Sequence, residues 1–312
     1  MNGLQLSREY YANTAEPSLK REFPDIYPRL AAGLAGNGSE CFGYDDEISR
    51  DHDWGIDFYI WSLEQDKDRI PSLTDWKRDL FDKHPPQHAR ERSDYGARIA
   101  VMSCGEFYSS LIGAPNGPTT INEYLRAPEE NFAMATNGAV FYDGPGEFSK
   151  TRSLLLEYFP EDIRRKRIAA KCMALAQTGQ YNHSRVARRR DWVTLRTVLS
   201  RFTDSAIAMA FLLNRAYRPY YKWAYKALEA LPILGAETGR LLLLIAEAGA
   251  FDDVAFGARE CYIEELCALF AEELRAQGLS SSRESFLVAH GEEAMSLIED
   301  KLLRSLPAQY EI

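Results

Sequence analysis

The sequence predicts an α+β protein, in which a small mixed-sheet domain over residues 1–146 is followed by an all-helical bundle domain over residues 147–312. Three observations lead to this fold class. The 312 residues are enough for two domains of ordinary size. Short apolar or aromatic runs bounded by glycine, which are typical of strands, stand in the first half of the chain. In the second half, Gly and Pro are sparse and apolar residues recur at helical spacing.

Local patterns give the elements of the first domain. Amphipathic helices are expected at 6–11 and 18–23, ahead of Pro24 and Pro28. The apolar run at 30–35 predicts the first strand, which ends in the turn Gly36-Asn37-Gly38-Ser39. A charged segment at 64–92 is expected to be helical and then looped. Runs of aromatic, β-branched or small apolar residues predict the remaining strands, at 54–61, 97–102 and 139–142.

The second domain is expected to be a bundle because its apolar residues are spaced three and four apart. Leu195, Val198, Leu199 and Phe202 show this spacing. The apolar run at 239–245 is soon followed by Glu247, so it is too short for a membrane span and predicts a buried helix.

Composition and charge narrow the class of protein. A hydrophobic fraction of 46% with 27% charged residues is typical of a packed globular protein. The N-terminal residues lack the apolar core of a secretory signal, so we expect a cytoplasmic protein without a membrane partner. The five cysteines include no CxxC pair, which favours reduced thiols over disulfides or a zinc site. The net charge of −9 argues against wholesale nucleic-acid binding but leaves room for a local basic patch.

The segment 38–53 concentrates residues that suit phosphate chemistry. Gly38 and Ser39 follow a predicted strand, where a flexible turn can present backbone N–H groups and a hydroxyl to phosphate oxygens. Asp51 and Asp53 are one residue apart, so on an extended chain both carboxylates lie on the same face and can bind hard cations jointly. His52, between them, is expected to point to the opposite face in a structural role.

This combination resembles the nucleotidyltransferase superfamily built on the polymerase-beta-like palm. Its signature is a Gly-Ser turn, a second glycine and Ser-x-Asp-x-Asp, matched here by Gly38-Ser39, Gly43 and 49–53. The wider string is similar to a bacterial branch of uncharacterised function with a C-terminal helical domain. That branch also tends to carry a turn like that at 140–144 and a Tyr-x-Pro-Tyr-x-Lys-Trp stretch like that at 217–223. The resemblance implies that 1–146 is a nucleotidyltransferase-like domain and that Asp51 and Asp53 are catalytic and hold Mg²⁺, with Mn²⁺ as an alternative.

One departure from the superfamily concerns a third carboxylate, which active members usually carry on a neighbouring strand. The strand predicted at 97–102 has no acid, and Arg98 stands where one is expected. The possible substitutes are Asp57, Asp143 and the acidic cluster Asp45-Asp46-Glu47, for which a solvated loop is the simpler interpretation. Because an arginine disfavours a nearby cation, loss of catalysis with retained nucleotide binding is an open alternative.

Several residues of the helical domain are weighed between binding and structural roles. The runs Arg164-Arg165-Lys166-Arg167 and Arg188-Arg189-Arg190 suit the triphosphate or a polyanionic acceptor such as RNA, although most such runs are solvated helix faces. Lys222 stands among tyrosines and Trp223, and suits either phosphate binding with stacking on a base or a snorkelling role over an aromatic core. Gln180-Tyr181-Asn182 is either an acceptor-pocket segment or a turn between helices.

These observations lead to one favoured function and two alternatives. The favoured function is metal-dependent transfer of a nucleoside monophosphate from a nucleoside triphosphate to a hydroxyl-type acceptor, which is a small molecule, a protein or an RNA. In it Gly38, Ser39 and Lys222 bind the phosphates, and Asp51 and Asp53 bind magnesium. The alternatives are a catalytically silent nucleotide-sensing or RNA-binding protein and a structural partner in a larger assembly.

Overall fold

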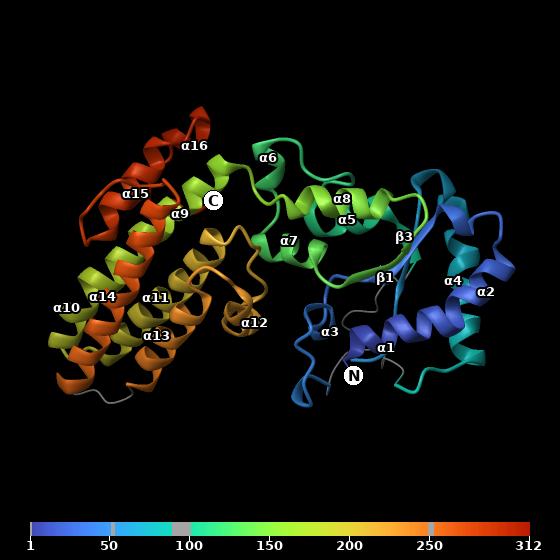
Figure 1. The fold of residues 1–312 in the computed structure, drawn as a ribbon, viewed down its shortest axis with the longest axis horizontal. Helices are drawn as coiled ribbons and strands as arrows, with labels where there is room; N and C mark the ends of the chain where they lie inside the picture. The colour runs from blue at the N-terminus through green and yellow to red at the C-terminus, as the bar shows by residue number, and fades with distance from the viewer. Residues whose placement is uncertain (1, 51–53, 89–100, 249–252) are drawn as a thin grey trace. The chain divides into compact units, whose positions relative to one another are not determined.

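The computed structural model describes residues 2–50, 54–88, 101–248 and 253–312, which form two compact units, Met1–Glu157 and Tyr158–Ile312 (Figure 1). The first unit contains a small four-stranded mixed sheet with helices. In its described residues, the second unit contains only helices and their connections. The α+β class is therefore confirmed.

The sheet has the strand order β3-β2-β1-β4. Strand β1 (Leu30–Leu34) pairs antiparallel with β2 (Tyr59–Ser62) and with β4 (Ala139–Asp143). Strand β2 pairs parallel with β3 (Val101–Ser103). The predictions at 30–35 and 139–142 are confirmed. The strand predicted at 54–61 is shorter than expected, because its ladder with β1 begins only at Tyr59. Of the strand predicted at 97–102, residues 97–100 lie outside the described residues.

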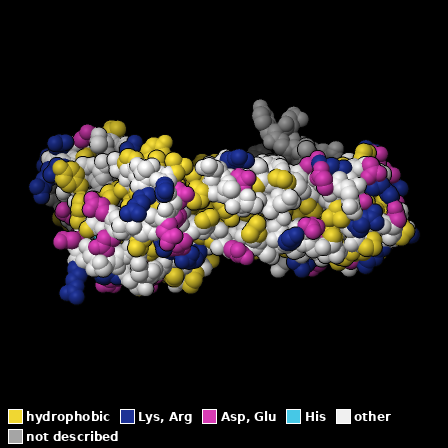
Figure 2. Space-filling model, turned by 90° about the horizontal axis from the view of Figure 1, so that it is seen from above, with side chains coloured by type: hydrophobic (Ala, Val, Ile, Leu, Met, Phe, Trp, Pro, Cys, Tyr) yellow, Lys and Arg dark blue, Asp and Glu magenta, His cyan; other side chains and the backbone are white. Residues whose placement is uncertain are grey.

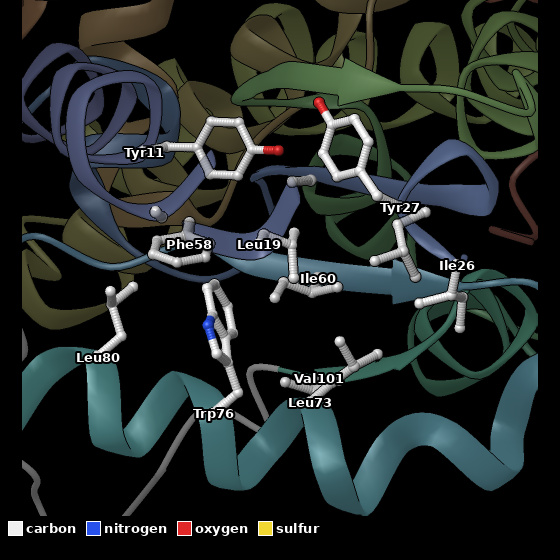
Figure 3. Close-up of a cluster of buried hydrophobic side chains, with 13 residues drawn as sticks. Tyr11, Leu19, Ile26, Tyr27, Phe58, Ile60, Leu73, Trp76, Leu80 and Val101 are labelled. Atoms are coloured by element: carbon white, nitrogen blue, oxygen red, sulfur yellow. The ribbon is translucent and has the colours of Figure 1, made fainter. Parts of the chain in front are cut away.

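One face of the sheet is covered by the N-terminal helices and by α4 (Ile70–Lys83). Helix α1 (Gly3–Tyr10), a π-helical turn at Tyr11–Ala15 and α2 (Glu16–Glu22) form one continuous helical run where two separate helices were predicted. Figure 3 shows the core between this run, β2 and α4, where Phe58 and Ile60 contribute the same face of the strand. Its almost fully buried members include Tyr11, Leu19, Ile26, Phe58, Ile60 and Leu73.

The opposite face of the sheet carries an aromatic layer. Tyr59 and Trp61 alternate with Phe58 and Ile60, so they point to this side. The Trp61 ring stacks on Phe148 with 3.8 Å between centroids, and Phe107 packs edge-on against Trp61. The helices of this half of the first unit are α5 (Cys104–Ile112), α6 (Ile121–Tyr124), α7 (Glu129–Thr136) and α8 (Glu147–Leu156).

The second unit is built around α9 (Glu161–Leu175), which packs against α11 (Trp192–Leu213) and α15 (Leu287–Ser296). A π-helical segment, η5 (Ala176–Asn182), continues α9 into α10 (His183–Arg188). The other helices are α12 (Tyr221–Ala227), α13 (Gly235–Glu247), α14 (Asp253–Ala276) and α16 (Lys301–Ser305). In the part of the chain that the structure describes, no helix is long and apolar enough to cross a bilayer. All five cysteines are free thiols, as predicted.

Candidate functional site

The glycine-rich turn lies directly after the central strand β1. Gly36 (φ 95°) and Gly38 (φ 126°) both adopt positive φ, which favours glycine, and Ser39 begins the short helix α3 (Ser39–Phe42). The first N–H groups of a helix have no partner inside it. The turn therefore places the N-terminus of a short helix and the Ser39 hydroxyl together in the sequence, and groups of this kind bind phosphate.

Asn137 holds this turn from the segment before β4. Its side-chain oxygen accepts a hydrogen bond from Gly36 N at 2.7 Å, and its Nδ2 donates to Gly36 O at 2.8 Å. Next to it, Gly138 N donates to Cys41 O at 2.8 Å. A Cβ on Gly138, which has a φ of 64°, would lie 1.9 Å from Leu34 O, so only glycine allows the two segments to approach so closely.

Arg152 of α8 fixes the segment that carries Asn137. Its guanidinium donates to the carbonyl oxygen of Thr136 at 2.6 Å and reaches that of Asn137 at 3.4 Å. Neither Arg152 nor Asn137 was predicted as a site residue. The signal in the sequence was the dipeptide Asn137-Gly138, which is typical of a tight turn.

The last residues of β1 and the first residues of β2 lie side by side at the same end of the two strands, because Gly33 near the end of β1 pairs with Tyr59 at the start of β2. Asp51, His52 and Asp53 precede β2 in sequence and lie outside the described residues. Whether the two aspartates share a face thus stays a prediction.

The acidic cluster before these residues has structural partners. Asp45 accepts hydrogen bonds from Gly3 N at 2.6 Å and from Trp54 Nε1 at 2.9 Å, which join the N-terminus of α1 to the chain on either side of 51–53. Asp46 accepts from both the N–H and the hydroxyl of Ser49, at 2.9 and 2.7 Å. Two of the three acids of this cluster therefore stabilise the loop by hydrogen bonds.

Asp57 and Asp143, the other substitutes, are also engaged. Asp57 forms an ion pair of 2.6 Å with Lys77 of α4, and both side chains are largely buried. Asp143 pairs with Ala31 at the start of β1, away from the strand end that leads to the turn. Its carboxylate accepts from Gly146 N and Ser149 N at the start of α8. Neither arrangement suits a third acid beside the turn.

The two predicted metal ligands, Asp51 and Asp53, lie outside the residues that the structure describes. Among the described side chains, no three His, Cys, Asp or Glu residues form a group that could hold a metal ion. Arg98 also lies outside the described residues. The magnesium prediction therefore continues to depend on Asp51 and Asp53.

Lys222 lies on an exposed face of α12 in the second unit. Its Nζ stands 5.0 Å from the centre of the Trp223 ring, which is a cation–π distance. The Tyr221 side chain is 73% exposed and its ring lies 4.3 Å from that of Tyr220. Lys222 is thus accessible to a ligand, whereas a snorkelling lysine over a closed core would leave its aromatic neighbours buried.

The basic run at 164–167 forms neither a polyanion surface nor a fully solvated helix face, which corrects both interpretations of it. Arg164 and Lys166 are almost fully buried, and burial lowers the pKa of both. Lys166 Nζ donates to the carbonyl oxygens of Pro307 at 3.1 Å, Ala308 at 3.2 Å and Tyr310. The positive charge of Lys166 is used to hold the segment after α16 against α9.

Gln180 does not line an acceptor pocket either. Its Nε2 donates to Glu264 at 2.8 Å and to Ser285 O at 2.9 Å, while its Oε1 accepts from Leu287 N at 3.0 Å. All its side-chain polar atoms are therefore engaged within the second unit. The segment is π-helical and continuous with its neighbours, so it is not a turn between helices.

Comparison with known protein families finds a match over part of the chain. Residues 124–224 match a family model described as a domain of unknown function (DUF4037). The matched range includes Asn137, Gly138 and Lys222 but not Gly38, Ser39 or 51–53. No curated protein and no solved structure matches the chain.

Proposed function

We propose that the protein is a metal-dependent nucleotidyltransferase that moves a nucleoside monophosphate from a nucleoside triphosphate to a hydroxyl-type acceptor. The observation that supports this best is the glycine turn after β1. Asn137 hydrogen-bonds to this turn, which lies at the end of the sheet where β2 begins. The motif Asp51-x-Asp53 stands shortly before β2 in the sequence. This order of turn, paired acids and strand is that of the nucleotidyltransferase signature.

Each side chain has a distinct role in the proposed reaction. The N–H groups of the turn and the Ser39 hydroxyl bind phosphate oxygens, and Lys222 is assigned to phosphate binding by its positive charge. An acceptor hydroxyl releases its proton to water and attacks the α-phosphorus. The new O–P bond forms as the bond between the α-phosphorus and the oxygen that bridges to the β-phosphorus breaks, and pyrophosphate leaves. Magnesium held by Asp51 and Asp53 would lower the pKa of the attacking hydroxyl and offset charge on the triphosphate.

A second candidate is a nucleotide-binding protein without transferase activity. It is favoured by the engagement of Asp45, Asp46, Asp57 and Asp143 in structural hydrogen bonds or ion pairs. Of the acids proposed to replace the third carboxylate, only Glu47 has no such role assigned in the described residues. In this candidate the turn and Lys222 keep their phosphate-binding roles.

Titration calorimetry and a pyrophosphate-release assay separate the two candidates. The full chain is titrated with each nucleoside triphosphate in Mg²⁺ or Mn²⁺, and pyrophosphate is then measured with mixtures of small-molecule, protein and RNA acceptors. The test variant is Asp51→Asn with Asp53→Asn. The matched control is Asp79→Asn, because Asp79 is an exposed acid of the first unit that lies 3.7 Å from Lys83.

The proposed transferase requires metal-dependent binding and pyrophosphate release that the double variant loses and the control keeps. Binding without release in any acceptor mixture identifies the nucleotide-binding protein. The absence of triphosphate binding in the unaltered chain refutes both candidates.

A further inference from the structure

Four arginines at the end of α10 form an exposed surface, here called the arginine patch: Arg185, Arg188, Arg189 and Arg190. In the described part of the chain, none of the four lies within salt-bridge distance of a carboxylate. Other exposed arginines of the second unit do have acidic partners, since Arg240 lies 2.6 Å from Glu265. An unneutralised cluster is unexpected in a protein with a net charge of −9.

The packing of α10 explains why these side chains face outward. His183, Val186 and Ala187 recur three and four residues apart and are all buried. Val186 and Ala187 belong to a small core that also contains Leu195 and Val198 of α11. With this face fixed inward, the remaining positions of the helix are turned to solvent.

Tyr181 extends the arginine patch with an aromatic surface. Its side chain is 46% exposed, and the guanidinium of Arg185 lies 3.6 Å from the centre of its ring. Positions 181, 185 and 189 are each four residues apart, so on a continuous helical segment they lie along one stripe. The stripe therefore combines a half-exposed aromatic ring, one face of which Arg185 covers, with positive charge along its length.

The charges around the patch do not cancel it. Asp191 follows it directly, but its carboxylate caps α11 by accepting hydrogen bonds from Thr194 N at 3.1 Å and Thr194 Oγ1 at 2.6 Å. These bonds lower the pKa of Asp191, so it contributes one negative charge beside four positive ones. Figure 2 shows Lys and Arg side chains gathered at the edge of the second unit at which α10 lies in Figure 1.

We propose that the arginine patch and Tyr181 form a binding surface for single-stranded RNA. Guanidinium groups bind phosphate oxygens with two parallel hydrogen bonds, and an exposed tyrosine ring stacks on a base. A charge interaction alone would suit any polyanion, whereas the tyrosine on the same stripe favours a ligand with unstacked bases. The surface uses none of the residues assigned to nucleotidyl transfer, so RNA binding can be tested independently of that function.

The salt dependence of RNA binding measures how many phosphate contacts the arginine patch makes. Each phosphate contact to a single strand contributes about −0.7 to the slope of log Kobs against log salt, so four contacts give roughly −2.8. Affinity should then fall roughly 50-fold between 50 and 200 mM salt. With Arg185, Arg188 and Arg189 all changed to Gln, one contact remains, and the corresponding fall should be only about threefold.

The experiment measures fluorescence anisotropy of a labelled single-stranded RNA of mixed sequence with the full chain across this salt range. The charge-matched control changes Arg21, Arg78 and Arg240 to Gln, because these arginines are exposed but paired with acids. Tyr181→Leu is tested alone and should weaken binding about fivefold or more with the slope unchanged. Circular dichroism confirms that each variant is folded.

The expected result is a steep slope in the unaltered protein and in the control, and a shallow slope in the patch variant. Equal slopes in the control and patch variants would overturn the proposal, as would an unchanged affinity in Tyr181→Leu. Vesicles containing phosphatidylserine are the comparison ligand. If the protein binds them through the patch but does not bind the RNA, the surface is a lipid-binding one and the proposal is wrong.

Discussion

Replacing Asn137 tests whether this side chain holds the glycine turn. Gly36 is buried, and Asn137 satisfies both its N–H and its carbonyl oxygen, at 2.7 and 2.8 Å. Asn137→Ala leaves a buried donor and a buried acceptor unpaired, and each such group costs about 1–3 kcal/mol. We therefore expect the free energy of unfolding of the first unit to fall by about 2–6 kcal/mol.

Asn137→Asp provides a graded comparison. The carboxylate can still accept from Gly36 N but has no N–H to donate to Gly36 O, so about half of the loss is expected. It also places a negative charge beside the turn. If the turn binds phosphates, this variant should weaken triphosphate binding more than Asn137→Ala does, although it destabilises the fold less.

The assay combines urea unfolding of the full chain with hydrogen exchange of the amides at 36–43. The control is Asn131→Ala, because Asn131 makes one side-chain hydrogen bond of 2.6 Å, to Leu111 O on α5. The control should lose stability without faster exchange in the turn. If Asn137→Ala leaves exchange at 36–43 unchanged, or matches the control, Asn137 does not hold the turn.

Three further predictions concern other buried groups. Gly138→Ala should cost more than about 3 kcal/mol in urea unfolding, because φ is positive and the new Cβ meets Leu34 O at 1.9 Å; a smaller loss would show that the two segments can separate. Lys166→Met should make the chain after residue 306 sensitive to limited proteolysis, since three carbonyls lose their donor; unchanged resistance would contradict this role. Burial, assisted by Arg259, lowers the pKa of His183 to about 4, so its neutral form is favoured in the fold. The free energy of unfolding should therefore keep its full contribution from neutral His183 above pH 6.5 and lose about 3 kcal/mol as the pH falls towards 4. His183→Leu should remove this part of the pH dependence. Equal dependence of unfolding on pH in the two proteins would disprove this role of His183.

Local sequence patterns predicted the parts of the fold that depend on local chemistry. The small apolar run at 30–34 is buried on all sides as the central strand, and the glycines that follow it adopt the positive φ that a turn there requires. These features could be predicted because each depends on the preferences of neighbouring residues. The fold class follows from them and from the helical spacing of the second half.

Contacts between distant residues could not be predicted in this way. Asn137 is 101 residues from Gly36 in sequence, and no spacing rule connects a side-chain amide to a turn so far away. The run at 164–167 suggests a surface by its charge, but backbone carbonyls from 307–310 provide a buried partner for Lys166. Gln180 was likewise misassigned because Glu264, Ser285 and Leu287 are far from it in the chain.

The two hydrogen bonds between Asn137 and Gly36 have a consequence for how the glycine-rich turn forms during folding. A turn formed by residues 36–39 but secured by residues 137 and 138 cannot take its final shape until the strand β4 has docked beside β1. Closing so long a loop is entropically costly and slow. A peptide that carries only the glycine-rich segment should therefore not keep the shape of the turn, and transplanting the turn into another scaffold would require β4 and its leading Asn-Gly pair as well.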